Sequence, residues 1–333
     1  ARKLIFYNGF VFSFIKLTFL SYSFRPKNSK DIKTHTLDCA EFKKYCIIIQ
    51  GPIIENDNFT YETIKIYQKF YSKSLIILST WSDTPEKVIS KFKNLGIKVL
   101  LNKKPSSPGW SHINYQMYSV YNAIQFAKKN NIQFIAKTRT DCRVYSNNFL
   151  FYCSALLEQY PSGDDKIKRI ISTDYSSKHI IYALDDKFQF GCIKEMEIFW
   201  NYKPWEKEID NLFNGQKIIN YTPVVCEFFL TARYLKLIKK FEDWTLVSWW
   251  NSLKDYFIII DSSSIDLFFY KYDYYFEQRG HKAYGSEYAK SLSHVDWLLF
   301  HFNKIKSWKF KDPDTLIKWE ITKSGEIRKL RIR

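Results

Sequence analysis

Between residues 45 and 139, short apolar runs alternate with segments of helical length, and this order constrains the fold more than any other feature. The apolar runs are 45–49, 74–78, 97–101 and 133–136. The intervening segments with helical spacing or start signals are 58–71, 84–96 and 112–130. Crossovers of helical length join parallel strands, so the order predicts a parallel sheet covered by helices on both faces. Neither G-x-G-x-x-G nor a P-loop pattern occurs, which argues against a dinucleotide dehydrogenase and a Walker ATPase.

The fourth apolar run ends in charged side chains at alternate positions. Because alternate residues of a strand share a face, Lys137, Arg139 and Asp141 are expected to point the same way, with Arg143 as a candidate continuation. Ligands of open α/β sheets bind at the carboxyl ends of the strands. Two cations beside one carboxylate suit a phosphorylated ligand, with or without a metal ion. The alternative is a strand end with solvated charges.

The second half of the chain is less regular. Its expected strands are 169–173, 187–190 and 257–260, and its expected helices are 194–202 and 224–239. Thr222-Pro223 is a start signal for the second helix, and the tail predicts a hairpin around residues 323–326. No domain boundary is evident beyond a peripheral segment 1–38 and a core half that ends near residue 150.

The chain is strongly basic, with 51 Lys and Arg against 34 Asp and Glu and a net charge of +17. Such a balance favours nucleic acid, an anionic membrane or phosphorylated substrates. No RNA-binding, zinc or helix-turn-helix motif accompanies the charge, so a nucleic-acid-binding protein is kept as the alternative function. The six cysteines form no CxxC pair, which indicates a reducing, cytosolic compartment. The apolar segment Leu4–Leu20 is interrupted by Asn8 and Lys16, which argues against a membrane span and favours a core-packing or terminal element. The alternative is a peripheral membrane contact helped by Lys3, Lys16 and Arg25.

Four blocks of sequence carry a family resemblance. They are IIIQGPI (47–53), LIILSTW (75–81), NYQMYSVYNAIQFA (114–127) and IAKTRTD (135–141). In this order the chain resembles the WavE-type family of bacterial lipopolysaccharide and capsule biosynthesis proteins, which look like GT-A-type glycosyltransferases. The resemblance covers about residues 45–230.

The resemblance implies transfer of a sugar from a nucleotide-sugar donor to a growing surface glycan or glycolipid. The implied location is the cytoplasm, at the inner face of the inner membrane, with peripheral contact to anionic lipid. The implied fold is α/β and GT-A-like (Rossmann-like), a mostly parallel sheet flanked by helices, with a less regular C-terminal half and a terminal β-hairpin. One domain would then contain a peripheral segment (1–38), a nucleotide-sugar-binding half (39–150) and an acceptor-binding half with a C-terminal extension (151–333). Transfer of a phosphorylated alditol, or nucleotide-sugar binding without turnover, are alternatives on the same fold.

GT-A enzymes usually hold Mn²⁺ or Mg²⁺ with a D-x-D motif after the fourth strand. The matching positions are Arg139-Thr140-Asp141, so Asp141 alone keeps a carboxylate. We expect a divalent ion held by Asp141 and a second, distant carboxylate or His, with His281 and His294 as candidates. The alternative is direct neutralisation of the diphosphate by Lys137, Arg139 and Arg143.

Donor-binding residues are expected where the strands end at the ligand edge. The candidates are Gln50, Gly51, Ser79, Thr80, Trp81, Asn114, Lys137 and Arg139. Each has a structural alternative: a turn at Gly51-Pro52, a buried Trp81, and a local cap at Asn114 or at the weaker candidate His112.

An inverting enzyme needs a base that accepts the proton of the acceptor hydroxyl. Glu227 resembles the acceptor-side acid of inverting GT-A enzymes, and its helix start is expected to lower its pKa. Glu227 and Asp141 are therefore the predicted catalytic residues. Asp174, Asp186 and Asp261 are alternative bases. Phe188–Gly191 is a candidate acceptor-side wall.

Overall fold

The computed structural model describes residues 25–33, 39–178, 180–207, 226–273, 292–307, 318–321 and 327–330. Four of the sequence-based predictions fall outside these residues: Leu4–Leu20, the start signal Thr222-Pro223, His281, and the turn at 323–326.

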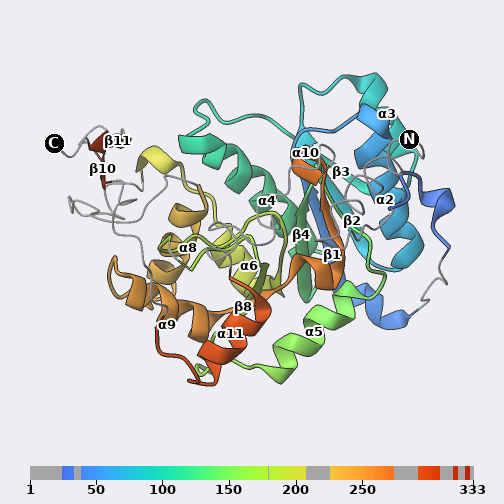
Figure 1. Cartoon of the computed structure of the whole chain (residues 1–333). Coiled ribbons are helices and arrows are strands. Elements are labelled where there is room, and N and C mark those ends of the chain that lie inside the picture. Colours follow the sequence, from blue (N-terminus) through green and yellow to red (C-terminus); the bar gives the residue numbers. More distant parts are fainter. Residues whose placement is uncertain are drawn as a thin grey trace, which may run out of the picture.

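A seven-stranded sheet of order β3-β2-β1-β4-β7-β6-β8 forms the centre of the molecule (Figure 1). Its strands are β1 Tyr45–Gln50, β2 Leu75–Trp81, β3 Lys98–Asn102, β4 Phe134–Arg139, β6 Ile170–Thr173, β7 Gln189–Cys192 and β8 Phe257–Ile260. The first four strands are mutually parallel, and β7 runs antiparallel to both of its neighbours. The expected α/β class with a mostly parallel sheet is confirmed.

Helices cover both faces of the sheet, with α2 and α3 on one face and α4 and α6 on the other (Figure 1). The α-helices are α2 Phe59–Phe70, α3 Glu86–Lys93, α4 Ile113–Lys128, α5 Phe149–Gln159, α6 Ile193–Phe199, α8 Cys226–Leu237, α9 Leu246–Tyr256, α10 Tyr270–Asp273 and α11 His294–His301. Short 3₁₀ turns are η1 Ser29–Asp31, η2 Ala40–Lys44, η3 Asn56–Asn58, η4 Trp110–His112 and η5 Ser262–Ile265. Within the described ranges, none of these helices has the length and apolarity needed to cross a bilayer.

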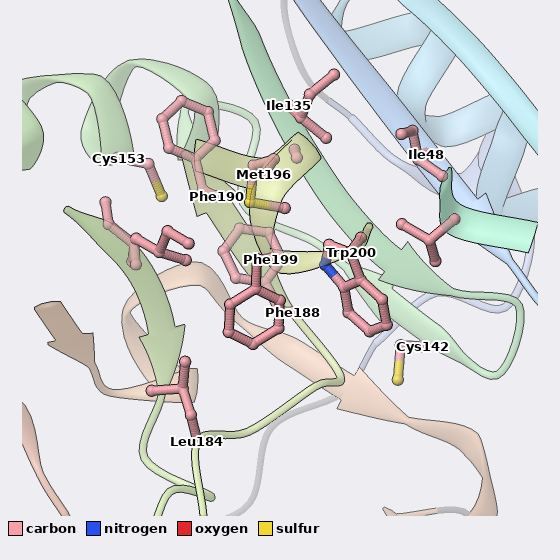
Figure 2. Packing of buried hydrophobic residues seen from close by; sticks show 14 of the residues in the cluster. Ile48, Ile135, Cys142, Cys153, Leu184, Phe188, Phe190, Met196, Phe199 and Trp200 are labelled. Carbon is pink, nitrogen blue, oxygen red and sulfur yellow. The ribbon is translucent and has the colours of Figure 1, made fainter. Parts of the chain in front are cut away.

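Aromatic packing fixes β7 against β4 and so determines what reaches the carboxyl end of β4. The ring of Phe134 stacks on Tyr45 and on Phe190, with centroids 5.4 and 5.8 Å apart. Phe188, Phe190 and Trp200 fill the core beside β4 (Figure 2). Because Gln189 pairs with Lys137 in the antiparallel register, the residues just before β7 pass the end of β4. The same packing contradicts Phe188–Gly191 as an acceptor-side wall, since both phenylalanines are buried in the core.

After β4 the chain turns at Thr140-Asp141 into β5 (Cys142–Val144), which pairs antiparallel with β9 (Leu267–Phe269). The sequence suggests Arg143 as a continuation of the charged row. Arg143 instead belongs to this small sheet and does not share a face with the row. Its guanidinium is buried, donating to Thr63 Oγ1 and to the carbonyls of Phe59 and Lys27, each at 2.9 Å. Arg143 therefore connects β5 to α2 and to the segment that contains Lys27.

The last described strands, β10 (Lys318–Ile321) and β11 (Ile327–Leu330), pair antiparallel. This pairing agrees with the expected C-terminal hairpin.

Candidate active site

Arg139 and Asp141 form a two-pronged ion pair at the carboxyl end of β4. Arg139 Nε donates to Asp141 Oδ1 and Nη2 donates to Oδ2, each at 3.0 Å. Both side chains keep some exposure, 29% for Arg139 and 16% for Asp141. The expected placement of these two charges together at the ligand edge is therefore correct, and the pair lies where a solute can reach it.

Asp186 lies on the same face of the sheet, close to the positive charges of Lys137 and Arg139. Arg139 Nη1 lies 3.5 Å from Asp186 Oδ1, and the Lys137 ammonium donates to the Asp186 carbonyl. Lys137 is fully buried, with its Nζ 4.6 Å from the centroid of the Trp200 ring. Burial lowers the pKa of Lys137, although the charge of Asp186 opposes this. Lys137 and Arg139 thus share a face, as the two-residue period of the strand predicts.

The two residues that flank Asp186 extend this charge cluster. Lys187 Nζ donates to Asp185 Oδ1 at 2.5 Å, and Thr173 Oγ1 donates to Asp185 Oδ2 at 2.5 Å. Burial alone would lower the pKa of Lys187, but Asp185 and Asp186 outweigh it and hold that pKa above its ordinary value. Phe269 of β9 lies beneath Arg139 and Lys187, whose charged ends are 5.5 and 5.6 Å from its ring centroid. The cluster therefore joins β4, β6, β7 and β9.

Glu227 reaches this cluster from the first turn of α8. Burial, together with the negative charge of Asp186, raises the pKa of Glu227 to about 7, and Lys187 opposes the rise only in part. The expectation that the helix start would lower this pKa is wrong. The reason is that desolvation and a neighbouring carboxylate outweigh the helix dipole, which is worth at most about 2 kcal/mol. A carboxyl group with this pKa is suited to accept a proton near neutral pH.

Cys226 accompanies Glu227, and its thiol donates to Glu227 Oε2 at 3.3 Å. Burial and the charge of Glu227 raise the pKa of the Cys226 thiol. The thiol is therefore held in its neutral form beside the carboxylate.

Three side chains of this cluster are close enough to share a cation. Ligand atoms of Asp186, Cys226 and Glu227 all lie within 4.8 Å of one another. Neither carboxylate oxygen of Asp186 has a hydrogen-bond partner within the described part of the chain. Two carboxylates fit Mn²⁺ or Mg²⁺, whereas the sulfur of Cys226 is a ligand that those ions do not prefer. Asp141, the predicted ligand, is outside this group and has both oxygens bonded to Arg139.

Gln50 and Gly51 end β1 next to Thr140, as expected for residues at the ligand edge. The Thr140 amide donates to the Gln50 carbonyl at 3.0 Å, and the Gly51 amide donates to the Ser79 carbonyl at 3.1 Å. Gly51 has φ +125°, and a Cβ there would lie 2.8 Å from Thr140 Oγ1. The glycine lets the end of β1 pass close to the turn that carries Asp141. A donor contact by Gln50 and Gly51 stays a prediction.

The other strand-end candidates are tied into the fold. Ser79 donates to the Ser119 carbonyl at 2.7 Å and accepts from Asn102 at 2.9 Å. The Trp81 ring packs 5.3 Å from that of Tyr115. Thr80 is the exception, because its buried hydroxyl has no hydrogen-bond partner among the described residues.

Asn114 lies in the first turn of α4 and binds the segment that follows α6. Its amide nitrogen donates to Glu206 Oε2 at 3.0 Å, and its oxygen accepts from the Trp205 amide at 2.8 Å. These bonds position the segment after α6, and binding of donor hydroxyls by Asn114 stays a prediction.

The alternative bases and metal ligands have local partners. Asp174 accepts from the Ser262 amide at 3.1 Å, and Asp261 accepts from the His294 amide at 3.0 Å. His294 Nδ1 lies 2.6 Å from the Ile259 carbonyl, and its ring stacks on Trp297. His112 is the residue that precedes α4, with φ 62°. Of these alternatives, only Asp186 belongs to the charge cluster.

Sequence reasoning missed Asp185, Lys187 and Cys226 as parts of the site. The signal for the first two was present, because a run of three charges, Asp185-Asp186-Lys187, stands directly before the apolar strand β7. A charged run that enters a buried strand marks a place where charges must be paired. Nothing in the local sequence distinguishes Cys226 from the other buried cysteines.

No family model matches the chain, and no curated protein matches it. Similar solved structures include a cytidylyltransferase from Leptospira borgpetersenii, at 12% identity and TM-score 0.37, covering 81% of this chain and 99% of that one. A glycosyltransferase involved in glycosylation of the major capsid of PBCV-1 is similar at 11% identity and TM-score 0.33, covering 66% and 82%. A mannosyltransferase from Pyrobaculum calidifontis, solved with GDP-Man and Mn²⁺, is similar at 12% identity and TM-score 0.32, covering 46% of each chain. Likeness at this level does not carry an activity to the chain.

Proposed function

We propose that this chain is a glycosyltransferase of the hexosyl- or heptosyltransferase kind, taking a sugar from a nucleotide-sugar donor. One observation carries the proposal: a carboxyl group with a pKa of about 7, Glu227, adjoins the Arg139–Asp141–Asp186 cluster at the carboxyl end of β4. The site thus combines a proton acceptor with cations that suit a diphosphate. The WavE-like sequence blocks support a lipopolysaccharide or capsular glycan as the acceptor, and the cytoplasm beside the inner membrane as the location.

In this proposal an acceptor hydroxyl attacks the anomeric carbon of the donor. The new glycosidic bond forms as the bond from carbon to the diphosphate oxygen breaks, and the electron pair of that bond leaves with the nucleoside diphosphate. Glu227 accepts the hydroxyl proton. Arg139 and Lys187 neutralise the developing charge on the diphosphate, and a planar guanidinium such as that of Arg139 matches phosphate oxygens in two places.

The donor would lie along the strand ends. Six residues would contribute to nucleotide and sugar binding: Gln50, Gly51, Ser79, Thr80, Trp81 and Asn114. Lys137 would contribute indirectly, through its contact with Asp186. Ser79 and Trp81 would act through backbone or packing, since the Ser79 hydroxyl is engaged within the fold. The buried hydroxyl of Thr80, which has no hydrogen-bond partner among the described residues, is the polar group in this set best able to accept or donate a new hydrogen bond.

A divalent ion, Mn²⁺ or Mg²⁺, is part of the proposal. Asp141, with Asp186 as second carboxylate, would hold it, and when bound it would neutralise the donor diphosphate. The buried oxygens of Asp186 support this choice of second ligand, because within the described residues they have no hydrogen-bond partner and Oδ1 lies 3.5 Å from Arg139 Nη1. Asp186→Asn should then remove the effect of Mn²⁺ on the binding of a nucleoside diphosphate.

The experiment that tests the function is a binding and turnover screen of UDP-, GDP-, CMP- and dTDP-sugars, with and without Mn²⁺. We expect one nucleotide class to bind and to release its nucleotide slowly by hydrolysis. The same screen with oligonucleotides addresses the alternative function. Binding of oligonucleotides but of no nucleotide-sugar would reject the transferase.

A further inference from the structure

The edge of the sheet opposite to the candidate site is rich in lysine. Parallel strands β1, β2, β4, β6 and β8 all begin at this edge, and β7 ends there because Cys192 pairs with Phe134. Exposed lysines stand in the segments that meet there. We call the following set the basic edge: Lys43, Lys73, Lys128, Lys129, Lys166, Lys168, Lys194, Lys239, Lys304 and Lys306.

A cavity of about 380 Å³ opens in the basic edge, between the ends of α8 and α6 and the segment before β6. Its lysines are Lys166, Lys194, Lys239 and Lys240. Lys240 pairs with Asp164 at 3.0 Å, and the Lys194 ammonium donates to the Lys166 carbonyl at 2.9 Å, which leaves its charge uncompensated there. Glu195, the second acid of the lining, is buried and accepts the Lys168 amide at 3.1 Å. The mouth of the cavity is therefore positively charged.

The same cavity has an apolar side. Ile167, Ile198, Leu237 and Ile238 line it, and Leu237 is 40% exposed. A site for a free inorganic anion has no use for an exposed leucine beside its cations. Lysines next to exposed aliphatic side chains are instead typical of surfaces that lie in a membrane interface.

The C-terminal end of helix α11 adds a second apolar surface near the cavity. Leu299 and Phe302 are 40% and 56% exposed, and their spacing of three residues puts them on one face, whereas Val295 lies at the other end of the helix, where the His294 amide donates to Asp261 after β8. Segment 160–167 joins this face to the cavity: Tyr160 packs on Phe302 with centroids 6.3 Å apart, and Asp164 holds Lys240. Lys304 and Lys306 follow the helix directly.

We propose that the basic edge binds an anionic phospholipid surface, with a headgroup phosphate in the cavity and the C-terminal end of α11 lying against the acyl boundary. The charge of the edge matches a phosphate-bearing leaflet, and its apolar side chains match the layer beneath. Nucleic acid is less suited, because the exposed large apolar residues at this edge are aliphatic apart from Phe302, and bases stack on aromatic rings. In this arrangement the membrane lies on the side of the sheet away from Glu227.

Co-sedimentation of the full chain with vesicles tests the proposal. We expect binding to phosphatidylcholine vesicles that contain about a quarter phosphatidylglycerol, little binding to pure phosphatidylcholine, and weakening by salt. One lysine near an anionic surface is worth roughly fivefold in binding, so Lys166→Gln/Lys194→Gln/Lys239→Gln should weaken it on the order of 100-fold. The matched control is Lys87→Gln/Lys103→Gln/Lys207→Gln, which removes the same charge from exposed lysines away from this edge and should bind nearly as well as the wild type.

A second variant, Leu299→Ser/Phe302→Ser, tests the apolar contact and should also weaken binding at constant charge. Four results would overturn the proposal. They are no binding of the wild-type chain to anionic vesicles, equal loss in the two lysine variants, full binding by the serine variant, and lysine-dependent binding of an oligonucleotide without any binding of vesicles.

Discussion

Arg139 bonds both carboxylate oxygens of Asp141 at 3.0 Å and places its remaining nitrogen 3.5 Å from Asp186. One guanidinium thus links an acid that follows β4, Asp141, to an acid that precedes β7, Asp186. A diphosphate that enters this edge would compete with Asp141 for the same planar donor face. We infer that Arg139 exchanges an internal partner for the donor, which lowers the desolvation penalty of donor binding.

Arg139 should therefore control donor affinity. Charge-assisted hydrogen bonds contribute about 1.5–3 kcal/mol each, so Arg139→Met should weaken binding of the nucleoside diphosphate by at least roughly 10-fold. Arg139→Lys should restore only part of the affinity, because an ammonium cannot bond two oxygens in a plane. Isothermal titration calorimetry measures this, with circular dichroism as the control for folding. Equal affinity in all three proteins would contradict the assignment.

Glu227 should make the stability of the protein depend on pH. Its pKa is about 7 in the folded chain and near its ordinary value of 4.5 when unfolded, so the folded state holds the proton more tightly. Stability contributed by this group is present below pH 4.5 and lost as pH rises towards 7. A shift of this size corresponds to roughly 3 kcal/mol.

Glu227→Gln removes that dependence. The variant should gain up to about 3 kcal/mol relative to the wild type between pH 5 and pH 8, measured by urea unfolding at both values. Glu158→Gln is a suitable control, because Glu158 is an exposed carboxylate on α5. A difference between Glu227→Gln and wild type that is the same at both pH values would contradict the raised pKa.

Gly51 should be required for the close approach of β1 to the turn at Thr140. Gly51→Ala combines φ +125° with a Cβ placed 2.8 Å from Thr140 Oγ1, and it should destabilise the fold by about 2–4 kcal/mol. Thr140→Ala removes the clashing atom. In the Thr140→Ala background, Gly51→Ala should therefore destabilise the fold only by its backbone strain. Thermal unfolding of the double-mutant cycle measures the coupling. Additive effects would rule out the contact.

Lys137 should be needed to keep Asp186 charged. Burial raises the pKa of Asp186, but Lys137, Arg139 and Lys187 outweigh it and hold that pKa below its ordinary value. The Lys137 ammonium donates to the Asp186 carbonyl, and its charge compensates that of the buried Asp186 carboxylate, so Lys137→Met should destabilise the fold at pH 7 by up to about 3–5 kcal/mol. Lys137→Met/Asp186→Asn should be more stable than Lys137→Met alone, as measured by chemical denaturation. No recovery in the double variant would show that Lys137 acts by packing on Trp200.

The elements that the sequence predicts well are those fixed by local pattern. The first four strands are continuous apolar runs bounded by turn residues, and the two-residue period places Lys137 beside Arg139 without knowledge of the fold. Boundaries differ by one to three residues, as for α3, where Pro85 precedes the helix instead of beginning it. These features depend on interactions within a few residues.

The parts that the sequence did not reveal depend on pairing between distant segments. Strands β5 and β9 have three residues each and lie far apart in the chain, so neither carries a pattern of its own. Without that pairing, Arg143 looks like a fourth member of the charged row. The sequence predicts the wrong direction for the pKa of Glu227 for the same reason, because both the burial of its carboxyl group and its contact with Asp186 depend on distant segments.

The central claim is that Glu227 takes the proton from the acceptor while Arg139 and Lys187 hold the departing nucleoside diphosphate. The most direct measurement is the release of nucleoside diphosphate from the bound nucleotide-sugar across pH 5–9, in the wild type and in Glu227→Gln, beside the affinity of each protein for the donor. The account predicts a wild-type rate that rises through about pH 7, and a variant that binds the donor normally but turns over at least roughly 100-fold more slowly without that rise. A variant with the wild-type rate and pH profile would contradict it.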